Sequence, residues 1–130
     1  MKNIIKLSLF TLGTLASNLT IANEISPDFL KKEIALAHTQ YLKGTSDSGL
    51  YALKALARIL ESDNSSALQS EVGPNSLSFT YLRIGLLHES LGDLSKAGAY
   101  FDKAINLYKD KHVGISQLKA FVARLDEMSS

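Results

Sequence analysis

The sequence predicts an all-α protein of about five helices, and three observations support this fold class. Apolar residues recur every three or four positions along most of the chain, which is the period of an amphipathic helix. No segment alternates apolar and polar residues consistently enough to be a strand. The 130 residues, of which 45% are hydrophobic and 21% charged, have the size and composition of one globular domain.

The N-terminal segment 1–22 has the pattern of a secretory signal peptide. Lys2 and Lys6 form a short basic start. An uncharged apolar run follows over 7–16, and Ala22 is a small residue before a polar stretch. The alternative is an anchor that stays in the membrane, but the run is shorter than the roughly 20 residues that a spanning helix needs. We therefore expect cleavage after Ala22, with Thr14 and Ala16 offering a second, earlier site, and a periplasmic or secreted protein without a membrane span.

The rest of the chain, 23–130, is expected to form a single α-helical domain. Its expected parts are a helical hairpin over 27–61, a loop over 62–77, a second hairpin over 78–111 and a C-terminal capping helix over 114–128. Turn-forming residues separate these parts, and Gly73-Pro74-Asn75 is the strongest helix breaker among them. The short links within each hairpin predict antiparallel neighbours.

Start and stop signals define the first hairpin. Ser26 is a good N-cap for a helix over 27–43, because proline follows it at the first helical position. Gly44 stands where a left-handed residue usually ends a helix. Asp47 or Ser48 is then expected to cap the second helix.

The second hairpin, residues 78–111, resembles a tetratricopeptide repeat, a helix–turn–helix unit of about 34 residues. The residues that match the family's skeleton of large and small positions are Tyr81, Ile84, Gly85, His88, Gly92, Asp93, Leu94, Ala97, Phe101 and Ala104. Gly85 and Ala97 are small where the paired helices have to approach closely. The sequence departs from the family at Lys109, where a proline is usual, and at His88, where a tyrosine is usual.

The resemblance implies a protein-binding module in which the first helix of the unit lines a concave groove. It places Phe79, Leu82, Leu86 and Glu89 on that groove as candidate partner-binding residues. The family's groove for charged C-terminal peptides uses Lys and Asn near the positions of Leu82 and Leu86, so these apolar residues disfavour a carboxylate clamp. The expected partner is another protein or a second copy of the chain. Either the groove is open for a hydrophobic helix, or the chain's own first helix fills it.

Charge and composition exclude several function classes. The formal net charge of +1 gives no electrostatic case for nucleic acid or an anionic membrane. The absence of cysteine excludes disulfides, thiol catalysis and Cys-ligated metals. His88-Glu89 begins like a zinc-protease motif, but Gly92 stands where the second histidine is needed. We therefore expect no metal, no cofactor and no catalytic residues.

The sequence thus predicts an exported adaptor that binds another protein without catalysing a reaction. One alternative is a structural subunit whose repeat serves self-assembly, and concentration-dependent association would distinguish it from a monomeric adaptor. Another is a small hydrolase with an unrecognised site, which would need a polar pocket containing a plausible general base.

Overall fold

The computed structural model describes residues 25–62, 72–73 and 75–129, and in these residues all the regular structure is helical. The five helices are α2 (Pro27–Lys43), α3 (Ser46–Ser62), α5 (Ser76–Ser90), α6 (Leu94–Leu107) and α7 (Ile115–Ser129). This confirms the all-α fold class. The expected signal peptide over 1–22, and most of the loop over 62–77, lie outside the described residues. None of the described helices is long and apolar enough to cross a membrane.

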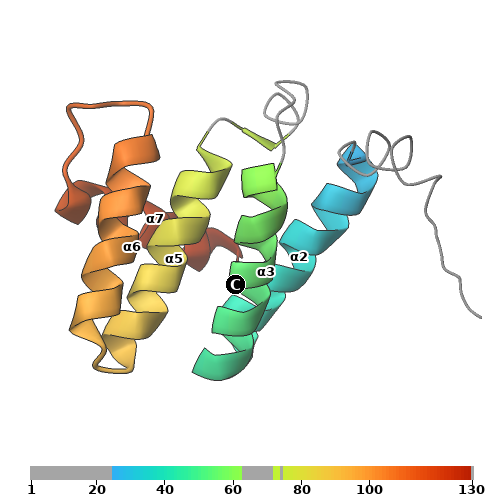
Figure 1. Ribbon diagram of the computed structural model, residues 1–130, viewed down its shortest axis with the longest axis horizontal. Coiled ribbons are helices and arrows are strands. Elements are labelled where there is room, and N and C mark those ends of the chain that lie inside the picture. Colours follow the sequence, from blue (N-terminus) through green and yellow to red (C-terminus); the bar gives the residue numbers. More distant parts are fainter. Residues whose placement is uncertain (1–24, 63–71, 74, 130) are drawn as a thin grey trace, which may run out of the picture.

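Four helices stand side by side in chain order, and the fifth crosses behind them (Figure 1). Helix α2 packs against α3, α3 against α5, and α5 against α6. Successive helices run in opposite directions, so α2–α3 and α5–α6 are two antiparallel hairpins (Figure 1). Helix α7 follows α6 and contacts it, as expected of a C-terminal helix. It does more than cover the end of the row, because it crosses behind the other helices (Figure 1).

The first hairpin differs from expectation in how its two helices are joined. Helix α2 has the predicted bounds, and the Ser26 side chain accepts a hydrogen bond from the Phe29 backbone N–H. Gly44 is not left-handed, because its φ of −90° and ψ of −171° are extended. Glycine is needed there for space, since an added Cβ would lie 2.7 Å from the Gln40 carbonyl oxygen. Thr45 caps α3 in place of Asp47 or Ser48, with its hydroxyl oxygen 3.0 Å from the Ser48 backbone nitrogen.

The turn of the second hairpin has the expected construction. Gly92 is left-handed with a φ of +83°, a conformation that favours glycine. Asp93 accepts a hydrogen bond from a backbone N–H in the first turn of α6. Helices α5 and α6 also approach closely at Gly85, as expected. A Cβ added to Gly85 would lie 2.6 Å from Phe101 and 3.2 Å from the Ala97 carbonyl oxygen.

The ends of the second hairpin shift slightly from the predicted bounds. Helix α6 ends at Leu107, and the backbone of Tyr108 is extended. The Asn75 side chain accepts a hydrogen bond from the Lys109 backbone N–H at 2.9 Å, which ties the two ends of the hairpin together. Leu94, which matches the repeat pattern at the start of α6, is 67% exposed.

The buried core extends through all five helices. Its members are Leu30, Ala37, Leu53, Leu56, Ala57, Tyr81, Leu82, Ile84, Ala104, Leu118 and Val122. Leu118 and Val122 belong to α7, and neither side chain is exposed. Helix α7 is therefore part of the packed domain.

Candidate functional site

The four candidate groove residues lie along one side of α5, at helical spacing. Leu82 is fully buried, Phe79 and Leu86 are partly buried, and Glu89 is exposed. Because α7 crosses this side of α5, the groove is already occupied in the isolated chain.

Contacts at both ends of this face show that α7 is the occupant. The ring of Phe79 meets the ring of Phe121 edge to face, with the centroids 5.9 Å apart. The Glu89 carboxylate lies 3.1 Å from the Lys119 ammonium nitrogen. Leu82 lies between Phe79 and Glu89 on the same helix and is fully buried. Helix α7 therefore covers part of this face of α5, and the expected filling by the first helix stays a prediction.

An ion pair that is largely shielded from solvent joins the C-terminal part of α7 to α5. Arg83 donates to Asp126 through Nη2 at 2.8 Å and through Nε at 3.1 Å. The two side chains are only 14% and 12% exposed. His38 from α2 reaches the same carboxylate, with 3.4 Å between Nε2 and Oδ1. Asp126 thus joins three helices at one point.

Tyr41 on α2 completes this polar cluster. Burial, followed by the negative charge of Asp126, raises the pKa of Tyr41 to about 12. The guanidinium carbon of Arg83 lies 5.8 Å from the centre of the Tyr41 ring, within the range of a cation–π contact. The phenol therefore stays neutral and can act as a hydrogen-bonding and stacking surface at physiological pH.

Part of the groove remains uncovered next to this cluster. A hollow of about 500 Å³ lies between α2, α5 and α7, and its lining includes Tyr41, Leu42, Leu86, Leu87, Ala123 and Glu127. Leu86 is therefore a candidate groove residue that borders this hollow. A second hollow, of about 330 Å³, lies between α2, α3 and α5, and Phe79 and Arg83 contribute to its lining.

Most of the residues that match the repeat pattern lie in the interior. Tyr81, Ile84, Gly85, His88, Ala97 and Ala104 are all buried. His88 stacks on Tyr100 with 5.7 Å between the ring centres. In the part of the chain that the structure describes, no three His, Asp or Glu side chains are grouped so that they could hold a metal ion.

Sequence reasoning did not find Arg83, Asp126 or Phe121 as groove residues. Arg83 and Asp126 are separated by 43 positions, so no local spacing links them. A signal was present in α7 itself, where Leu118, Phe121 and Val122 form an apolar stripe that needs a partner surface.

Comparison with known protein families, curated proteins and solved structures finds no match to this chain. The proposals below therefore depend on the residues and their geometry.

Proposed function

We propose that this protein is an exported, non-catalytic interaction module whose concave groove binds an amphipathic helix of a partner protein. The observation that supports this function most directly is the position of α7, an amphipathic helix, in the groove. Two side-by-side helical hairpins, of the kind that tetratricopeptide repeats stack, create such a groove. The chain's own α7 then serves as a guide to the ligand that the groove accepts.

The contacts of α7 define the chemistry of that ligand. Leu118 and Val122 are fully buried, and Phe121 lies beside them on the same stripe. Lys119 and Asp126 add a cation and an anion two turns apart, which pair with Glu89 and Arg83. A partner helix with an apolar stripe between a basic residue and a later acidic residue would meet the same groups.

A partner helix would have to displace α7, and the connection of α7 to the rest of the domain allows this. The link 108–114 between α6 and α7 has no helical structure. The ion pairs and ring contacts that hold α7 are between side chains. Release would expose Leu118 and Val122, at about 1.5–3 kcal/mol for each side chain, and would break the Arg83–Asp126 pair, which a partner helix with the same charges would form again. This cost lies within the reach of a partner helix that buries the same surface.

A peptide experiment on the full chain tests this function. A fluorescent peptide with the sequence of residues 114–129 should bind the wild-type chain weakly, because α7 competes for the groove. In Val122→Asp, a buried charge should expel α7 and strengthen peptide binding by about tenfold or more. The matched control is Ala120→Asp, since Ala120 is exposed on α7 and lines neither hollow beside α5.

The result of this experiment can contradict the proposal in two ways. Peptide affinity could be equal in Val122→Asp and Ala120→Asp, which would mean that the groove does not accept an amphipathic helix. Alternatively, circular dichroism could show that Val122→Asp unfolds all helices together, which would make α7 an inseparable part of the core. The same peptide can also test a natural partner. If the peptide displaces that partner from the Val122→Asp variant, the two bind the same groove.

The export part of the proposal has its own test. N-terminal sequencing of the protein recovered from cells should find Asn23 as the first residue, because Ala22 precedes a polar stretch. A protein that starts at Met1 would contradict export through a cleaved signal.

Self-assembly remains a second candidate because of one exposed surface. Leu36 is 54% exposed and Tyr51 is 78% exposed, so both side chains are open to solvent among the described residues. Both line a hollow of about 420 Å³ between α2 and α3. Sedimentation over a range of protein concentrations would separate a monomeric adaptor from a self-assembling subunit, and Tyr51→Ser should abolish association in the second case.

A further inference from the structure

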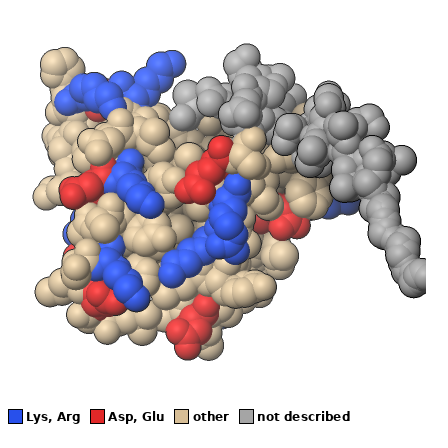
Figure 2. All heavy atoms as spheres, in the orientation of Figure 1, with Lys and Arg blue, Asp and Glu red and all other residues tan. Residues whose placement is uncertain are grey.

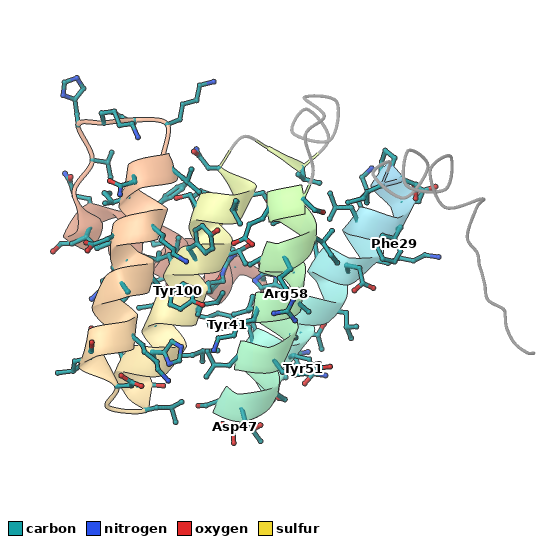
Figure 3. The ribbon with its side chains drawn as sticks, in the orientation of Figure 1. Phe29, Tyr41, Asp47, Tyr51, Arg58 and Tyr100 are labelled. Carbon is teal, nitrogen blue, oxygen red and sulfur yellow. The ribbon has the colours of Figure 1, made fainter. Side chains whose placement is uncertain are left out.

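A second surface lies on the face opposite α7, in the valley that α3 and α6 form over α5. We call it the α3–α6 valley, and its lining residues are Lys54, Arg58 and Glu61 from α3, Tyr81 from α5, and Tyr100 and Lys103 from α6. Its volume is about 220 Å³. Figure 3 shows Arg58 and Tyr100 on the side turned to the viewer, whereas α7 lies behind the row. The valley is therefore separate from the groove.

Helical spacing brings the charged residues of the valley together. Lys54, Arg58 and Glu61 stand one turn apart along α3, so they share one face of that helix. Tyr100 and Lys103 do the same on α6. Figure 2 shows basic side chains over both helices on this face, with acidic side chains between them.

Two aromatic rings hold one of the cations in place. The Lys103 ammonium nitrogen lies 5.3 Å from the centre of the Tyr81 ring and 5.1 Å from that of Tyr100. The two ring centres are 6.0 Å apart. Lys103 is thus positioned above a paired aromatic surface while the residue stays exposed to solvent.

The positive charge of the valley exceeds its negative charge. Within the described residues, Lys54, Arg58 and Lys103 form no ion pair with a carboxylate. Glu61 is the acidic residue of the lining, and it accepts a hydrogen bond from the Tyr81 hydroxyl. The lining therefore contains three cations and one carboxylate, and that carboxylate already accepts a hydrogen bond from Tyr81.

A buried polar atom without a partner lies next to the valley. His88 is 5% exposed, and its Nε2 has no hydrogen-bond partner among the residues that the structure describes. Its ring stacks on Tyr100, which lines the valley. Burial lowers the pKa of His88, and the positive charge of Lys54 lowers it further. An anion in the valley would offset the charge of Lys54 that acts on this histidine.

We propose that the α3–α6 valley binds a phosphate-type oxyanion, either inorganic phosphate or the phosphate group of a small ester. Lys54 and Arg58 approach from α3, and Lys103 approaches from α6. A tetrahedral dianion can accept hydrogen bonds from donors that arrive from both sides, whereas a carboxylate offers two oxygens in one plane. Its double charge also gains more from three neighbouring cations than a single charge would.

Calorimetric titration of the full chain at constant ionic strength tests the site, with inorganic phosphate and glycerol phosphate as the two probes. We expect saturable binding of at least one probe. The probe that binds more tightly shows whether the ligand is free phosphate or a phosphate ester. Arg58→Gln and Lys103→Gln should each weaken binding about tenfold or more, because each removes a charged donor. Glu61→Gln should strengthen it several-fold, since the amide removes a negative charge and still accepts from Tyr81.

The control is Lys32→Gln on α2, which makes the same charge change at an exposed lysine outside the valley. Arg58→Lys should restore most of the affinity that Arg58→Gln loses, provided that circular dichroism shows the same helical content for all variants. The proposal is overturned if neither probe saturates, or if Lys32→Gln weakens binding as much as Arg58→Gln. Weaker binding in Glu61→Gln would also overturn it.

Discussion

Arg83 on α5 and Asp126 on α7 form a two-bond ion pair across 43 positions of sequence, with 2.8 Å between Nη2 and Oδ1. Both side chains are largely shielded from water, at 14% and 12% exposure. The pair joins the C-terminal half of α7 to the face of α5 that carries Phe79, Leu82 and Glu89. It acts together with the Phe79–Phe121 and Glu89–Lys119 contacts.

Asp126→Asn and Arg83→Gln should each destabilise the domain by roughly 2–4 kcal/mol. Each change leaves the partner charge poorly paired, and the slight exposure of both side chains keeps the cost below that of a fully buried pair. Urea denaturation followed by circular dichroism would measure the loss. Lys96→Gln is the matched control, because Lys96 pairs with Asp93 at 66% exposure and should cost less than about 1 kcal/mol. Equal losses for Lys96 and Arg83 would contradict the role of the shielded pair.

Gly85 and Gly98 should respond in opposite directions to the same substitution. Gly85→Ala should cost about 1–3 kcal/mol, because its Cβ would meet Phe101 and the backbone of Ala97. At Gly98 nothing lies within 4 Å of an added Cβ, so Gly98→Ala should stabilise α6 by about 0.5–1 kcal/mol. Thermal unfolding of the two variants tests the close packing of α5 against α6. A gain in stability at both positions would show that the helices are further apart than described.

Leu82→Lys should lose several kcal/mol of stability, because the side chain is fully buried beneath the occupied groove. Leu94→Lys is the control, since Leu94 is 67% exposed and should change stability by about 0.5 kcal/mol at most. Chemical denaturation of both variants gives the comparison. A stable Leu82→Lys would mean that the groove is open in solution and that α7 lies elsewhere.

The stability of the domain should fall in mild acid through His88. Burial lowers the pKa of His88 from its usual 6.5, so the unfolded chain takes up a proton that the folded chain resists. The contribution of His88 is therefore present above pH 6.5 and is lost as the pH falls toward its folded-state pKa. His88→Leu should remove this part of the pH dependence, whereas His112→Gln at an exposed position should not. Denaturation at pH 7.5 and pH 5 would show the difference, and identical pH dependence in wild type and His88→Leu would contradict it.

The sequence predicts the fold well where local signals act. Ser26 followed by proline gives the start of α2, and Gly92-Asp93 gives the turn between α5 and α6, because caps and left-handed turns depend on neighbouring residues. The close approach at Gly85 could also be predicted, since a small residue opposite Phe101 has a direct steric meaning. The prediction of a left-handed Gly44 is wrong, because a glycine after a helix can serve either a left-handed turn or a close approach, and Gly44 serves the second.

The candidate site could be predicted only in part. Helical spacing places Phe79, Leu82, Leu86 and Glu89 on one side of α5, but it does not say what covers them. The position of α7 depends on tertiary contacts such as Phe79 with Phe121, and these have no local signature. Leu94 shows a second limit of prediction from a repeat pattern. It matches the pattern, yet its side chain remains exposed to solvent.

Native-state hydrogen exchange of the wild-type chain tests most directly whether α7 occupies the groove as a displaceable helix. We predict that the amides of 115–129 are protected, but that they open at a lower free energy than those of α5 and without opening the two hairpins. Adding the 114–129 peptide should further raise exchange in the chain's own α7, because the peptide replaces it in the groove. Exchange of α7 only through global unfolding, at the same free energy as α5 and unaffected by the peptide, would contradict a groove that can receive a partner helix.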